Sequence, residues 1–125
     1  MAELNVRELD VWKVSMDLVA EVYRATRSWP KEELYGLTSQ IRRAAVSIPS
    51  NVAEGQGRNS TQEFLRFLGI SYGSLMEVQT QLLIAERLGY LDGTQAKEVV
   101  QLAERVAKLI NGLKRSLNLK LSGQA

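Results

Sequence analysis

The sequence predicts an all-α protein, an antiparallel up-down-up-down four-helix bundle that occupies residues 1–125 as a single domain. Apolar residues recur at intervals of three and four through four long segments, which is the spacing of one helix face. No segment alternates with the period of two that a strand requires, and only short connections with glycine or proline separate the four segments. Leu, Ala, Glu, Lys, Arg and Gln, all helix-favouring residues, are abundant.

The first helix is expected over residues 10–28, with Asp10 as its N-terminal cap and Pro30 just after its end. Two apolar stripes run along this helix. Together they cover more of the helix surface than the ~100° that one core contact needs. The first stripe comprises Val11, Val14, Leu18, Val22 and Ala25, and the second comprises Trp12, Met16, Val19 and Tyr23.

The second helix is expected over residues 32–54 and contains Pro49. The apolar spacing continues across the proline, so we expect one helix with a kink, because proline removes a backbone hydrogen bond and crowds the preceding turn. Ser47 and Asn51 lie on the opposite side, where small polar side chains favour a close contact with another helix or another subunit. The expected core face is Leu34, Leu37, Ile41, Ala44, Ala45, Ile48 and Val52.

Glycine and capping residues mark the remaining boundaries. The sequence GQG from Gly55 is expected to end the second helix. A capping box of Ser60 and Glu63 is expected to begin the third helix, which we place over residues 61–88. The fourth helix is expected over residues 93–119.

The first and third helices each carry a second apolar stripe, although a bundle helix needs only one to face its core. We therefore expect the protein to self-associate through these second stripes. The alternative is a thick bundle in which both stripes are internal. The residues assigned to the oligomer interface are Trp12, Met16, Tyr23, Ser47, Asn51, Leu65, Tyr72 and Met76.

The residue types that most catalytic and metal sites use are missing. The chain has no cysteine and no histidine, so it lacks thiolate ligands, the commonest metal ligand and the commonest general base. The GQGR segment follows a helix and lacks the Lys-Ser/Thr of a phosphate-binding P-loop. We expect a protein that is not an enzyme and has no catalytic site, metal site or cofactor.

The chain shows no charged and then apolar N-terminal signal. No apolar run approaches the ~18 residues that a membrane span needs. We therefore expect a cytoplasmic protein without a membrane partner.

Basic charge is concentrated towards the C-terminus. Residues 93–125 have a net charge of +4, whereas the preceding part of the chain has −2. Arginine suits bidentate contact with phosphate, and an oligomer would repeat each basic side chain around its axis. The alternative is ordinary surface ion pairs, such as Glu63–Arg66 and Glu104–Lys108. The candidate nucleic-acid-binding residues are Arg42, Arg43, Arg58, Arg66, Lys97, Lys108, Lys114 and Arg115.

Two long segments read LYGLTSQIRRAAVSIPSNVAEGQGR and EFLRFLGISYGSLMEVQTQLLIAERLGYL. Over residues 8–115 the chain resembles the S23 or intervening-sequence-protein family, which is named after members encoded within insertions in bacterial 23S ribosomal RNA genes. The resemblance rests on a specific run, in which the signature positions are Arg42, Arg43, Pro49, Ser50, Asn51, Glu54, Gly55 and Arg58.

The resemblance implies a four-helix bundle that assembles into a homopentameric, barrel-like ring. A relative, the accessory variability protein of diversity-generating retroelements, has a basic surface, binds nucleic acid and contacts a reverse transcriptase. Most members of the family have no established function, and the family has no recognised catalytic residues.

Two functions stay open at this point. The first is a non-enzymatic oligomeric bundle that binds RNA or DNA through repeated basic residues. The second is a scaffold that binds a protein partner and has no nucleic-acid role. If the protein binds phosphate groups, its affinity for nucleic acid should fall steeply as the salt concentration rises. A protein scaffold should show no such salt-dependent binding of nucleic acid.

Overall fold

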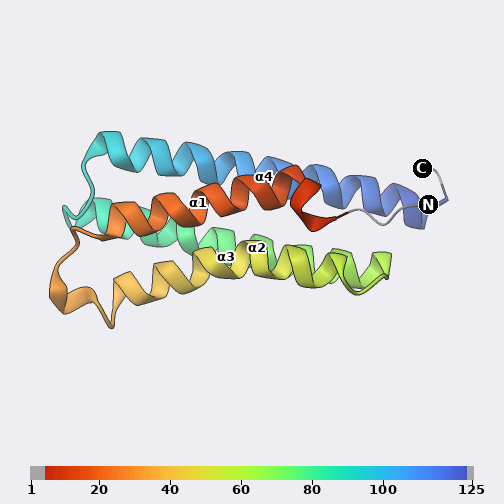
Figure 1. Cartoon of the computed structure of the whole chain (residues 1–125). Coiled ribbons are helices and arrows are strands. Elements are labelled where there is room, and N and C mark those ends of the chain that lie inside the picture. The colour runs from red at the N-terminus through yellow and green to blue at the C-terminus, as the bar shows by residue number, and fades with distance from the viewer. Residues whose placement is uncertain (1–4, 124–125) are drawn as a thin grey trace.

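The computed structural model describes residues 5–123, and all regular structure within that range is helical. The four long helices are α1 (Asp10–Thr26), α2 (Leu37–Gln56), α3 (Thr61–Arg87) and α4 (Gly93–Leu121), and two short 3-10 turns are η1 (Val6–Glu8) and η2 (Lys31–Glu33). The α1–α2 and α3–α4 connections lie at one end of the molecule, and the α2–α3 connection lies at the other (Figure 1). The prediction of an all-helical, four-helix fold is confirmed.

A single apolar core runs along the bundle. α1 packs against α2 and α4, and α3 packs against the same two helices. The first stripe predicted for α1 is buried throughout, which places it against this core. The largest fully buried side chains come from all four helices and include Leu18, Ile41, Ile48, Leu68, Leu75, Leu82 and Ile110.

The start of α2 differs from the prediction. The helix begins at Leu37, and the preceding residues form η2 and a turn, so Leu34 is 50% exposed and lies outside the core. The Glu33 side chain causes the late start, because its Oε1 accepts a hydrogen bond of 3.1 Å from the Leu37 amide. Gly36 makes room for it, since a Cβ there would lie 2.8 Å from that oxygen.

Glu33 also ties the two connections at this end of the bundle together. Its Oε2 accepts a hydrogen bond of 2.8 Å from the hydroxyl of Tyr90, which follows α3. The Tyr90 ring lies 5.8 Å from the ring of buried Trp29. One carboxylate therefore holds both the N-terminus of α2 and the α3–α4 connection.

α2 passes through Pro49 without interruption, as predicted. Side chains supplement the backbone bonds around the proline: Ser71 of α3 donates to the Ile48 carbonyl at 2.9 Å, and Asn51 donates to the Ser47 carbonyl at 2.8 Å. Such bonds support a helix whose regular ladder lacks one donor.

Gly55 does not end α2, contrary to the prediction, because the helix continues to Gln56 and has Gly57 as its C-terminal cap. Gly55 is buried, and a Cβ added there would lie only 2.6 Å from the Phe67 Cβ of α3. The glycine is therefore required for the close approach of the two helices.

The caps of the other helices follow local rules. The Ser60 side chain accepts a hydrogen bond of 3.2 Å from the Glu63 amide, and Asp92 accepts one of 2.8 Å from the Gln95 amide. The cap of α1 is Leu9, and Asp10 is the first helical residue rather than the predicted cap. At this position its negative charge still interacts favourably with the positive end of the helix dipole.

Candidate functional site

The second apolar stripe of α1 lies on the surface of the described chain. Met16 is 44% and Tyr23 39% exposed, whereas Trp12 is half-buried. On α3 the corresponding residues Leu65, Tyr72 and Met76 are half-buried, and the last two pack against the core. Further along α3, Leu83 is 55% exposed, so both α1 and α3 leave large apolar side chains at the surface.

The small polar side chains of α2 contact α3 of the same chain. The Ser47 hydroxyl lies 2.9 Å from the Ser74 hydroxyl, and Asn51 donates to the Ser47 hydroxyl at 2.8 Å. This side of α2 was expected to contact either another helix or another subunit. The hydrogen bonds of Ser47 and Asn51 form a contact with another helix of the same chain.

Two of the candidate arginines are already paired near the α2–α3 connection. Arg58 lies 3.4 Å from a Glu54 oxygen, and the Arg66 Nε donates to Glu63 at 2.9 Å. Both guanidinium groups also lie over the Phe67 ring, at 5.2 and 4.5 Å from its centre. The hydrogen bond lowers the pKa of Glu63 and raises that of Arg66. Arg58 and Arg66 therefore form surface ion pairs, which was the alternative to phosphate binding for the basic residues.

Arg42 is held in place within the bundle. Its Nε donates to the Thr26 hydroxyl at 2.9 Å, and its guanidinium lies 4.6 Å from the centre of the Tyr23 ring. Both partners belong to α1, so Arg42 links α2 to α1. Its neighbour Arg43 is exposed and has no ion pair or ring contact within residues 5–123.

The basic residues of α4 form a different set. Lys97, Lys108 and Arg115 are exposed and make no ion pair within the described chain, so the predicted Glu104–Lys108 pair is absent there. Lys114 lies 5.7 Å from the centre of the Tyr72 ring. Residues 105–120 contain five basic residues and no acidic one.

Sequence reasoning missed Arg105 as a member of this set. Its side chain is exposed. The absence of any acidic residue after Glu104 was the signal that could have identified it.

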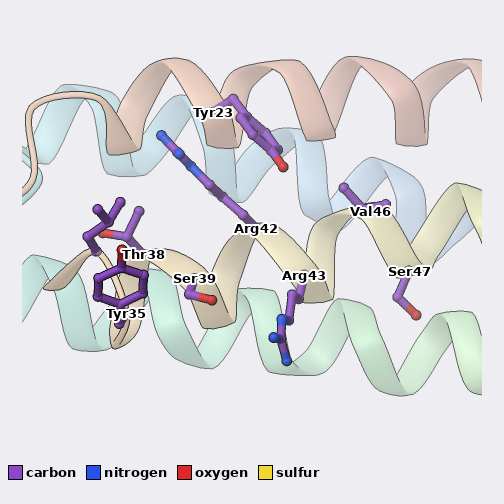
Figure 2. A pocket seen from close by; sticks show the side chains of 9 residues that line it. Tyr23, Tyr35, Thr38, Ser39, Arg42, Arg43, Val46 and Ser47 are labelled. Carbon is purple, nitrogen blue, oxygen red and sulfur yellow. The ribbon is translucent and has the colours of Figure 1, made fainter.

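A cavity of about 630 Å³ opens between α1 and the first half of α2. Arg42 reaches from α2 towards α1 and Tyr23, whereas Arg43 points the opposite way, across α3 (Figure 2). The cavity brings together residues that were predicted for separate roles in oligomerisation and nucleic-acid binding. Its lining residues are Tyr23, Leu34, Tyr35, Thr38, Ser39, Arg42, Arg43, Val46 and Ser47.

Tyr35 is one of four cavity residues that sequence reasoning did not select, the others being Thr38, Ser39 and Val46. Its side chain is 94% exposed, which makes it the most exposed large apolar residue of the described chain. It lies in the turn between η2 and α2, directly before Gly36. The sequence did offer a signal for Tyr35, because an aromatic residue stands next to a glycine in an otherwise polar connection.

The described residues contain no group of three or more Asp or Glu side chains placed to hold a metal ion. None of the helices within residues 5–123 combines the length and the hydropathy that crossing a membrane requires.

Comparisons with known proteins agree on one family. A family model described as 23S rRNA-intervening sequence protein matches residues 7–112. A crystal structure of a protein of unknown function from the S23 ribosomal protein family of Bacteroides thetaiotaomicron VPI-5482 superposes with a TM-score of 0.78 at 20% identity, covering 84% of this chain and 95% of that chain. That likeness shows the fold. No protein with a curated description matches the chain significantly.

Proposed function

This chain belongs to the 23S rRNA-intervening sequence protein family, and we propose that it is a non-enzymatic, self-associating bundle that binds RNA or DNA through the unpaired basic side chains of α4 and through Arg43. Neither the family nor the similar crystal structure carries an enzymatic activity in its description. The proposal therefore rests on the charges and contacts of the chain itself.

The observation that carries the proposal is the unbalanced charge of the second half of α4. Five basic residues and no acidic one lie within residues 105–120. The helix dipole accounts only for cations in the last turn. Lys108 lies more than three turns before the end of α4 at Leu121, so the dipole does not explain its position.

The basic residues of α4 are also aligned. Lys97, Lys108 and Arg115 are separated by about three and about two helical turns, so their side chains leave the same side of the helix. They extend over about 27 Å at 1.5 Å per residue. A duplex presents phosphate charges along comparable lengths, which suits a row of exposed cations.

Self-association completes the proposal. The exposed apolar side chain of Met16 on α1 favours contact with a second copy. In an antiparallel bundle assembled as a homopentameric ring, each α4 would be repeated fivefold and the fields of its cations would add. The expected partners are further copies of this chain and a nucleic acid.

Titration of a labelled structured RNA and a matched DNA duplex between about 50 and 200 mM salt tests the proposal. We expect a steep loss of affinity with salt. The double variant Lys108→Glu/Arg115→Glu should lower affinity roughly tenfold or more and flatten the salt dependence for both probes. Arg87→Glu reverses an exposed charge at the end of α3 and is the control.

A second function has support in the exposed stripe of α1, where Met16 and Tyr23 offer apolar surface. If neither probe binds at about 50 mM salt, the nucleic-acid proposal is wrong. The chain is then a scaffold for a protein partner, and charge reversal on α4 should leave capture of that partner unchanged.

A further inference from the structure

The cavity between α1 and α2 has an open mouth and aromatic walls. Its volume of about 630 Å³ lies within the range of small-molecule sites. Tyr23 and Tyr35 contribute rings, and Leu34 and Val46 add apolar surface, all of them more than a third exposed. A planar aromatic group bound in the cavity would stack on these rings and cover the apolar side chains.

The charge of the cavity is positive. Arg42 and Arg43 line it, and none of its described lining residues is acidic. The Arg42 bond to Thr26 uses Nε, so the terminal nitrogens of the guanidinium stay free of that bond. Thr26 and Tyr23 hold this cation in place, which reduces the entropy lost when an anion binds.

Polar groups complete the lining. Thr38 is buried and Ser39 half-buried at the start of α2, and both residues line the cavity. Each hydroxyl both donates and accepts hydrogen bonds, as the edge of a nucleobase also does. Aromatic rings and arginine side chains are components with which proteins bind single-stranded nucleic acid.

We propose that this cavity binds one unpaired nucleotide, with its base against Tyr35 and its phosphate at Arg42. The inference rests on the proposed nucleic-acid binding and adds a preference to it. Bases stacked inside a duplex cannot enter a cavity, so single strands and loops should bind more tightly than duplexes. The same chemistry would also accept a free nucleoside monophosphate.

Fluorescence anisotropy with a labelled single strand, an abasic strand of equal length and a duplex tests the proposal. Tyr35→Ser should weaken binding of the normal strand roughly tenfold, because stacking on an aromatic ring contributes that much per base. Binding of the abasic strand and of the duplex should not change. Leu83→Ser is the control, since Leu83 is similarly removed from the core at 55% exposure on α3.

The outcomes distinguish this proposal from the broader one. If Tyr35→Ser weakens no probe while Lys108→Glu/Arg115→Glu weakens all of them, the cavity proposal is wrong and the proposed function stands. If no strand binds, a titration with adenosine monophosphate decides: binding that Tyr35→Ser removes supports the cavity as a site for free nucleotides, and absence of binding overturns it.

Discussion

The two sides of α2 differ in how they use small residues. Towards α3, Gly55 in the second half of α2 allows close packing, and Ser71 of α3 adds a hydrogen bond to the Ile48 carbonyl. Towards α1, the first half of α2 leaves a cavity of about 630 Å³, lined in part by Thr38 and other small side chains. We call these the closed side and the open side of α2.

The difference shows that a small residue permits a close contact without producing one. On the closed side, Phe67 and Ser71 of α3 fill the space that the small residues of α2 leave. On the open side, Tyr23 and Val46 stay partly exposed at the rim. The closed side therefore contributes to stability, and the open side is available for binding.

The largest effect is expected from overpacking the closed side. Gly55→Val would place a branched side chain where a Cβ already lies 2.6 Å from the Phe67 Cβ. We expect the free energy of unfolding to fall by about 1–3 kcal/mol or more, measured by urea denaturation. Gly73→Ala is the control, because an added Cβ there meets nothing within 4 Å.

The control substitution Gly73→Ala should itself change the free energy of unfolding, in the opposite direction. Alanine inside a helix is more stable than glycine by roughly 0.5–1 kcal/mol, so Gly73→Ala should stabilise the protein. Equal destabilisation by both substitutions would show that α2 and α3 are not in close contact at Gly55.

A smaller effect is expected from a single hydrogen bond on the closed side. Ser71 is fully buried and donates to the Ile48 carbonyl, one residue before Pro49. Ser71→Ala should lower the free energy of unfolding by about 1 kcal/mol, because the buried carbonyl loses a donor. Thr80→Ala, which removes an exposed bond within α3, should change stability less and serves as the comparison.

On the exposed stripe of α1, substitutions should change assembly more than stability. Met16→Glu replaces a side chain that is 44% exposed, so the free energy of unfolding of the monomer should change by less than about 0.5 kcal/mol. A charge in an apolar contact should nevertheless dissociate the oligomer. Sedimentation equilibrium measures this, and a wild-type protein that is monomeric at micromolar concentration would contradict self-association.

The sequence was sufficient where structure depends on local spacing. The stripe from Val11 to Ala25 is buried as predicted, because helical periodicity alone decides which side chains share a face. Ser60 caps α3 for the same reason, since its partner is the Glu63 amide three residues away. The Glu63–Arg66 pair is likewise local, and the sequence offered it as the alternative to a binding role for Arg66.

Where the partner is distant in the chain, the sequence was insufficient. Gly55 looked like a helix stop because nothing in its neighbours shows that Phe67 lies against it. Leu34 seemed to belong to the core because the Glu33 carboxylate at the start of α2 could not be foreseen. For Arg42, which stays a candidate binding residue, the sequence could not show that Thr26, sixteen residues earlier, holds it in place.

The smallest expected effect concerns the residues that shape the open side. Glu33 fixes the turn that carries Leu34 and Tyr35, and the Tyr90 hydroxyl donates to it. This hydrogen bond raises the pKa of Tyr90 above its ordinary value near 10. A group whose pKa is raised on folding stabilises the folded state below its unfolded pKa, and this contribution is lost as the pH rises through the folded value. Thermal stability should therefore decline above about pH 10.

Tyr90→Phe removes the hydroxyl and retains the ring beside Trp29, so it isolates the hydrogen bond. The variant should be slightly less stable than the wild type at pH 7, and the gap should narrow above about pH 10, where the wild type loses the same bond. Tyr35→Phe is the matched control, because Tyr35 is exposed and its hydroxyl has no hydrogen bond within the described residues. A gap between Tyr90→Phe and the wild type that stayed constant with pH would show that Glu33 does not hold the open side through Tyr90.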